Sequence, residues 1–146
     1  MNDKSVGLIE LSSIAAGFSV ADSALKAGNV KLMLSRSICS GKYMILLAGD
    51  TASVEAAIAT GTETAGGCLI DHIVISNLHP DVLLAIGRTT PVEPTGALGI
   101  FESFNVATLI KAADAAAKAA QVQLLEVRLA MALGGCLLYT SDAADE

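Results

Sequence analysis

The sequence predicts an α+β fold in which a βαββαβα unit occurs twice, the second time incompletely. Three observations lead to this prediction. Short apolar runs alternate with longer segments of helical periodicity, the pattern returns after 92 residues, and a proline-containing connector separates the two copies. In such a unit the strands form a mainly antiparallel sheet whose helices cover one face.

The first helix of the unit is expected over residues 14–27. Ser12 or Ser13 can cap its start, and Gly28 or Asn29 can end it. Apolar residues recur along it at three- and four-residue intervals, which predicts one buried stripe. The residues of this stripe are Ile14, Phe18, Ala21 and Leu25.

The other elements of the first copy follow from similar signals. A turn at Ser40 and Gly41 joins two apolar runs, which favours a hairpin. Asp50 or Thr51 caps a second helix, and Pro80 opens a short third one. We expect strands at about 6–11, 30–34, 43–48 and 72–75, and the later helices at about 51–64 and 80–86.

The repeat is visible in ungapped segments. Residues 6–10 (VGLIE) return as 98–102 (LGIFE), and residues 21–27 (ADSALKA) return as 113–119 (ADAAAKA). The connector at 89–95 holds two prolines and has no apolar periodicity. The predicted organisation is a first domain over 1–88, a linker over 89–95, and the N-terminal half of a second domain over 96–135.

The last segment, 136–146, is predicted to be foreign to the protein. Its residues reverse-translate without a break into a transposase-type sequencing adapter, so we exclude it from the fold, as one excludes a cloning scar. On this interpretation Cys136 is not native. Without Asp142, Asp145 and Glu146 the net charge falls from −6 to −3. The strand expected after residue 122 then lacks the partner strands that complete its sheet.

The composition argues against a nucleic-acid-binding protein and against a membrane protein. The 146 residues are 53% apolar with a net charge of −6, and no basic stripe is present to bind nucleic acid. Charged residues interrupt every apolar run before it reaches the roughly 20 residues that span a bilayer, and the N-terminus does not resemble a signal peptide. We therefore expect a cytoplasmic protein with reduced cysteines and neither a nucleic-acid nor a membrane partner.

Signals for catalysis are weak, and we expect no enzyme. The sequence has no nucleophile elbow, and the glycines of segment 61–67 do not match a phosphate-binding loop. His72 and His79 have no further ligand at zinc spacing. Cys68 follows two glycines and precedes an apolar pair, which favours core packing.

The repeated motifs carry a family resemblance. Residues 6–10, residues 21–30 (ADSALKAGNV) and residues 40–43 (SGKY) resemble the bacterial microcompartment shell domain, and residues 98–122 resemble it again. Two copies in one chain imply the tandem-domain class, whose members form trimers that mimic hexagonal tiles. Within that class, residues 37–42 (SICSGK) and 75–80 (ISNLHP) resemble shell proteins of propanediol-utilising compartments.

The resemblance implies roles for individual residues. Ile38, Cys39, Ser40 and Gly41 would form a pore loop at the trimer axis, and Cys39 would bind a [4Fe-4S] cluster shared by three subunits. Lys26 and Lys118 would line the tile edge, whereas their spacing alone suggests surface ion pairs with Asp22 and Asp114. Implied partners are a homotrimer, other shell proteins and lumen redox enzymes, in a shell inside the bacterial cytoplasm.

Two alternatives remain open on the sequence. Cys39 can be an inert, metal-free cysteine in a tile whose pore conducts a small metabolite. The chain can also be a regulatory domain of ferredoxin-like architecture that binds a ligand between subunits. The repeated Asp-x-x-x-Lys helices favour a tile over that regulatory domain.

Overall fold

A computed structural model describes residues 4–87, 96–131 and 134–141. The chain divides into two compact units, Met1–Leu78 and His79–Glu146. The predicted linker at 89–95 and the predicted domain end at Arg88 lie outside the described residues. Within the described ranges, no helix is both long and apolar enough to span a membrane.

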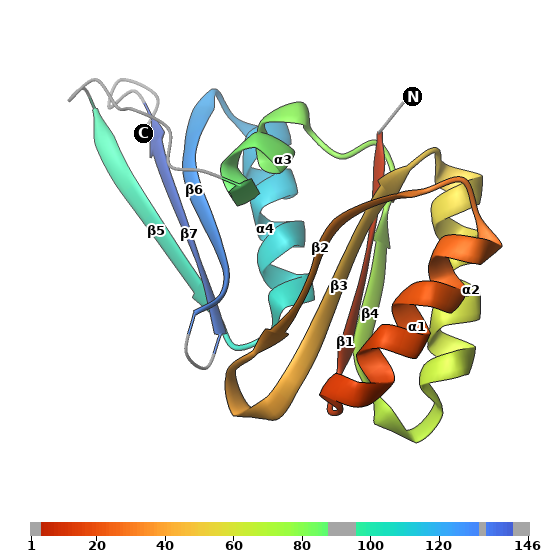
Figure 1. Ribbon diagram of the computed structural model, residues 1–146. Helices are drawn as coiled ribbons and strands as arrows, with labels where there is room; N and C mark the ends of the chain where they lie inside the picture. The colour runs from red at the N-terminus through yellow and green to blue at the C-terminus, as the bar shows by residue number, and fades with distance from the viewer. Residues whose placement is uncertain (1–3, 88–95, 132–133, 142–146) are drawn as a thin grey trace. The chain divides into compact units, whose positions relative to one another are not determined.

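The first unit is a four-stranded antiparallel sheet with helices on one face (Figure 1). The strand order is β2-β3-β1-β4, so the first strand lies inside the sheet. This arrangement confirms the predicted fold class. The elements are β1 (Ser5–Leu11), α1 (Ile14–Ala27), β2 (Lys31–Ile38), the 3-10 turn η1 (Cys39–Gly41), β3 (Lys42–Gly49), α2 (Thr51–Ala65), the 3-10 turn η2 (Gly66–Cys68) and β4 (Leu69–Ile75).

The core of this unit lies between the sheet and its two helices. Alternate residues of β1 and β3 point toward the helices, as the period of two in a strand requires. Glycines allow the layers to approach closely. A Cβ on Gly17 would lie 2.2 Å from the Tyr43 ring, and one on Gly7 would lie 2.5 Å from Ile58. The buried cluster includes Ile9, Leu11, Val20, Ala24, Tyr43, Ile45, Leu47, Val54, Ala57 and Ile58.

The predicted buried stripe of α1 is wrong in three of its four residues. Ile14, Phe18 and Leu25 are exposed, and of the stripe only Ala21 is buried. The helix instead buries a face of smaller residues, namely Gly17, Val20, Ala21 and Ala24. Both faces of the helix are apolar. The face with the smaller residues is buried because α1 packs closely on Tyr43 and on α2.

Each of the first two helices is capped by one of the two residues that the sequence offered for that position. Ser13 caps α1 by accepting a hydrogen bond from the backbone N–H of Ala16, and Asp50 caps α2 by accepting from the N–H of Ser53. The Ser53 backbone and hydroxyl groups hold the pKa of Asp50 below its usual value of 3.8, because both donate hydrogen bonds to its carboxylate.

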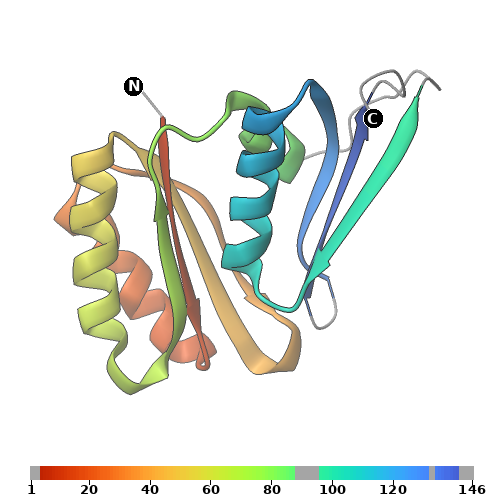
Figure 2. The ribbon, with the colours of Figure 1, turned by 180° about the vertical axis from the view of Figure 1, so that it is seen from behind.

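The second unit repeats the beginning of the first. Its sheet has the order β5-β7-β6, and α4 packs against all three strands (Figure 2). The short helix α3, which the sequence placed at the end of the first domain, packs on α4 and β6 of this unit. The elements are α3 (Pro80–Gly87), β5 (Ala97–Ser103), α4 (Val106–Ala119), β6 (Val122–Met131) and β7 (Gly134–Ser141).

The strand β7 gives β6 a partner that the sequence did not predict. It lies between β5 and β6 and pairs with both in antiparallel register. The expectation of an unpaired β6 therefore fails on one of its two edges. Most of β7 belongs to the segment 136–146 that the sequence assigned to an adapter, and residues 142–146 of that segment lie outside the described residues.

Candidate functional site

The predicted pore loop lies at the tip of the β2–β3 hairpin. Ile38 pairs with Lys42, and the three residues between them form η1. Gly41 has a φ of +74° with open space where a Cβ would be, so the tight turn favours glycine at this position. Ile38 is half-buried, and Cys39 is exposed with a free thiol. The structure therefore brings the predicted loop residues together at an exposed tip.

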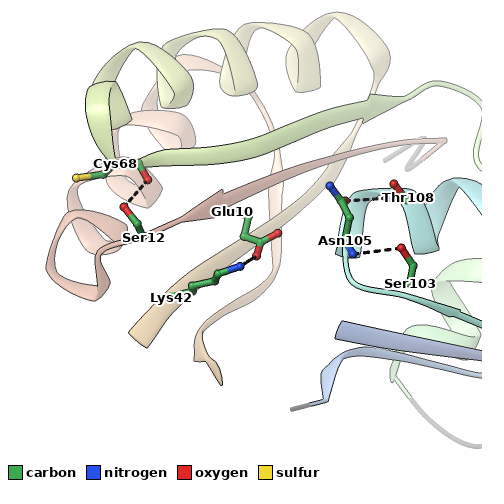
Figure 3. A network of polar contacts seen from close by, with 7 residues as sticks. All are labelled: Glu10, Ser12, Lys42, Cys68, Ser103, Asn105 and Thr108. Carbon is green, nitrogen blue, oxygen red and sulfur yellow. Dashed lines mark hydrogen bonds and ion pairs between the residues drawn. The ribbon is translucent and has the colours of Figure 1, made fainter. Parts of the chain in front are cut away.

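A partly buried ion pair anchors the residue that follows this turn. Lys42 Nζ donates a hydrogen bond of 3.0 Å to Glu10 Oε1 on β1 (Figure 3). The Glu10 side chain is 5% exposed and that of Lys42 is 35% exposed. An ionised carboxylate with so little water depends on its cation, so this pair ties the residue that follows the turn to the middle of the sheet.

The sequence analysis missed this anchor, although a signal was present. Glu10 lies in a strand where every other residue is apolar or small, and a charge in such a run requires a partner. The partner follows 32 residues later in the sequence, on a different strand. Only the pairing of β1 with β3 brings the two residues together.

The other cysteine is placed differently. Cys68 is half-buried in η2, not enclosed in the core as the sequence predicted. Its carbonyl oxygen accepts hydrogen bonds from the backbone N–H of Ser12, at 2.8 Å, and from the Ser12 hydroxyl, at 3.2 Å (Figure 3). This contact holds the end of β1 against the start of β4, which is a structural role for the Cys68 backbone.

Within one chain, the described residues offer an incomplete donor set for an iron–sulfur cluster. Among the described residues, no three His, Cys, Asp or Glu side chains gather as metal ligands. A cubane cluster takes three or four thiolates, and Cys39 supplies one. Its exposure at a hairpin tip fits a ligand set completed by two further copies around a threefold axis.

The two predicted edge lysines lie near the C-terminal ends of equivalent helices. Lys26 Nζ bonds Asp22 Oδ2 at 2.6 Å on α1, and Lys118 Nζ bonds Asp114 Oδ2 at 2.6 Å on α4. Both are the i, i+4 ion pairs that the spacing suggested. Both lysines are exposed, so each can also contact another molecule.

Comparison with protein families finds one type of domain twice in the chain. The profile of the BMC domain matches residues 5–78 and again residues 97–144. The chain belongs to the BMC domain family. It contains two copies of the BMC domain, of which the second is shorter. The second match continues into the segment 136–146, whose adapter origin stays a prediction that resequencing of the source gene would test.

Several BMC proteins are similar to the chain. It is 45% identical over 144 residues to the bacterial microcompartment shell protein PduT of Citrobacter freundii, covering 97% of the chain and 78% of that relative. The shell protein PduK of Citrobacter freundii is 42% identical over 83 residues, covering 55% of the chain and 53% of PduK. The carboxysome shell protein CcmK2 of Synechococcus elongatus is 32% identical over 94 residues, covering 60% of the chain and 92% of CcmK2.

A solved structure also resembles the chain. A microcompartment protein from Desulfitobacterium hafniense superposes with a TM-score of 0.88 at 43% identity, covering 96% of this chain and 79% of that one. The similarity therefore extends over both BMC domains and not over the first one alone.

Proposed function

We propose that this chain is a structural component of a bacterial microcompartment shell and not an enzyme. The observation that carries the proposal is the match of both domains to the BMC family, together with 45% identity to a shell protein along nearly the whole chain. In this proposal it assembles as a homotrimer that acts as a hexagonal tile, and the tile packs beside other shell proteins.

The η1 turn would line the central pore of such a tile. The proposed pore residues are Ile38, Cys39, Ser40 and Gly41. Three copies of the turn around one axis would bring three Cys39 thiols together, although each chain supplies one. The Glu10–Lys42 pair supports this assignment, because it fixes the base of the turn to the sheet and so limits where the thiol can point.

Three Cys39 thiolates would hold a [4Fe-4S] cluster and leave one iron open to an outside ligand. The bound cluster would supply one-electron transfer between the lumen and the outside of the shell. Its partners in the lumen would be redox enzymes. The η1 turn would supply the thiolates. Gly41 has no side chain, so it would place no bulky group beside them. Lys26 and Lys118 would lie at the tile edges.

The competing proposal is a tile whose Cys39 binds no metal and whose pore conducts a small metabolite. The free and exposed Cys39 thiol is compatible with it, because a pore lined by small residues needs no cofactor.

Iron analysis decides between the two. The chain is purified without oxygen as it is, and also with residues 1–135 joined to the remaining C-terminal part of the Citrobacter relative, which restores the length of the second domain. Iron, sulfide and visible absorption are recorded beside Cys39→Ala and the control Cys68→Ala. About four irons per trimer, lost only without Cys39, support the cluster. Assembled trimers without iron in any variant support the metabolite pore, and a chain that forms no trimer contradicts the tile.

A further inference from the structure

The backbone pairing of β1 with β3 stops one residue short of Lys42. Leu11 pairs with Tyr43 at the end of that ladder, whereas Lys42 pairs with Ile38 of β2. Because β2 is the outermost strand, β2 and β3 leave the sheet at this point as a two-stranded ribbon. Such a ribbon twists more strongly than strands inside a sheet. The position of η1 relative to the sheet therefore depends on how the ribbon is held.

The side chain of Lys42 provides the contact with β1 that its backbone does not make (Figure 3). Glu10 pairs with Met44, so Lys42 lies two residues further along β3 and on the same face of the sheet. A long side chain reaches a diagonal neighbour of this kind, and Lys42 Nζ lies 3.0 Å from Glu10 Oε1. The Glu10 side chain is 5% exposed, so replacing its cation by water would be costly. The pair is thus a fixed contact where the ribbon leaves the sheet.

The second domain lacks both the thiol and the lysine of this contact. Met131 stands at the position equivalent to Cys39, and Gly134 stands at the position equivalent to Lys42. The glutamate of β5, Glu102, is exposed, and a solvated carboxylate does not depend on a cation. The contact therefore occurs in the domain whose turn carries the cysteine, which links it to that turn and not to the backbone plan that both domains share.

We propose that Glu10 and Lys42 are positioning residues for the Cys39 thiol, and that their ion pair makes the thiols of three copies converge on one axis. The inference deepens the proposed function and rests on it, because convergence requires the trimer. Ligand atoms of a shared site must be held to within roughly 0.5 Å. The pair provides this precision by fixing the chain three residues after Cys39. Neither assembly of the trimer nor exposure of the thiol depends on it.

Arsenite tests convergence without iron, because As(III) binds three thiolates. Three As–S bonds form as three As–O bonds break, the thiol protons leave in three water molecules, and no electron is transferred. Cys68→Ala and Cys136→Ala are introduced into every chain, so that Cys39 is the one remaining thiol. Native mass spectrometry counts the arsenic in each trimer, and absorption of the As–S bonds gives the affinity. The background trimer should bind about one arsenic, since its threefold axis supplies one site.

A double substitution removes the pair without leaving a buried charge. Glu10→Met together with Lys42→Met should retain the fold, because apolar residues of similar volume replace the two ions. This variant should remain a trimer and bind arsenite at least roughly tenfold more weakly, since the thiols lose their effective concentration toward one another. Lys42→Arg keeps the charge and the reach, so it should bind arsenite like the background chain.

Two controls separate positioning from other effects. Glu102→Gln alters the equivalent glutamate of the second domain and should leave arsenite binding unchanged. Alkylation of Cys39 by iodoacetamide requires one exposed thiol and no convergence, so its rate should change less than about twofold in all variants.

Four outcomes would overturn the proposal while the shell function stands. They are a double variant that binds arsenite like the background chain, a double variant that no longer forms a trimer, Lys42→Arg binding as weakly as the double variant, and a background trimer that binds no arsenic. The second of these would make the pair an assembly contact, and the fourth would show that the thiols do not converge. A background chain that forms no trimer would contradict both the proposal and the shell function.

Discussion

The two BMC domains share a backbone plan more closely than they share side chains. Ser5 pairs with Gly49 between β1 and β3, and Ala97 pairs with Ser141 between β5 and β7, each 92 residues later. The helices α1 and α4 begin and end at the same offset. Hydrogen-bond register thus persists between the copies while the chemistry on the strands differs, because main-chain pairing does not depend on residue type.

Even the irregularity of the edge strand is repeated. The pairing of β2 with β3 skips Met33, and the pairing of β6 with β7 skips Leu125, its equivalent. A bulge bends a strand and increases its twist. Its presence in both copies indicates that this bend belongs to the unit itself and not to the surroundings of either copy.

The two domains differ in side chains at one place where a helix approaches the sheet. In the first domain Gly17 on α1 makes room for Tyr43, whose hydroxyl lies 2.9 Å from the Ser35 hydroxyl. In the second domain the equivalents of Gly17 and Tyr43 are Leu109, which is fully buried, and Gly135. At this pair of equivalent positions the large residue therefore lies on the strand in the first domain and on the helix in the second.

The largest expected effect comes from reversing this exchange in one copy. Gly17→Leu drives a side chain into the Tyr43 ring, which a Cβ would already approach to 2.2 Å, and should destabilise the chain by about 3 kcal/mol or more. Urea unfolding followed by circular dichroism measures the loss.

A compensating variant makes this test specific. Adding Tyr43→Gly to Gly17→Leu reproduces the pair found in the second domain and should recover part of the stability. If the double variant is less stable than Gly17→Leu alone, the interpretation as a volume exchange is wrong.

The next effect concerns the anchor of the η1 turn. Lys42→Met leaves the buried carboxylate of Glu10 without its cation and should cost about 1–3 kcal/mol in thermal or urea unfolding. The second domain provides the control, because Gly134 replaces the lysine there and the equivalent Glu102 is exposed. Glu102→Gln should therefore leave stability nearly unchanged, and an equal loss in both variants would contradict the anchor.

A smaller effect on stability is expected from a backbone difference between the β2–β3 and β6–β7 hairpins. Ala130 has a φ of 57°, a left-handed conformation that costs alanine roughly 1 kcal/mol, whereas its equivalent Ile38 is extended with a φ of −126°. Ala130→Gly should raise the unfolding free energy by about 1 kcal/mol, and Ile38→Gly should lower it. A loss of stability in Ala130→Gly would show that β6 does not adopt the left-handed conformation at residue 130.

The smallest expected effect is the pH dependence of helix capping. The Ser53 hydrogen bonds lower the pKa of Asp50 in the folded chain. The ionised Asp50 carboxylate therefore contributes fully to folding stability at pH above its pKa in the unfolded chain, and this contribution is lost as the pH falls through its pKa in the folded chain. Asp50→Ala should destabilise the chain at neutral pH and have less effect at pH of about 3. Asn105, which caps α4 through the N–H of Thr108, is the uncharged control: Asn105→Ala should show no such change (Figure 3).

Much of the fold followed from local signals in the sequence. The bounds of α1 were predicted to the residue, because a serine cap and a glycine stop are local features. The strands were predicted in the right order but too short, since β2 continues through polar residues to Ile38 and only its pairing with β3 marks its end. The loop and the two Asp–Lys pairs were also found from the sequence, by resemblance and by helical spacing.

What the sequence determined by itself was the duplication, the fold class and the positions of the motifs, because these depend on residue order and on interactions within a few turns. Tertiary structure decided which face of α1 is buried, that Glu10 meets Lys42, that α3 packs on α4, and that Asp114 and Asp22 differ in exposure. Each of these depends on packing between segments far apart in the chain, where volume and desolvation choose among faces that the sequence pattern leaves equivalent.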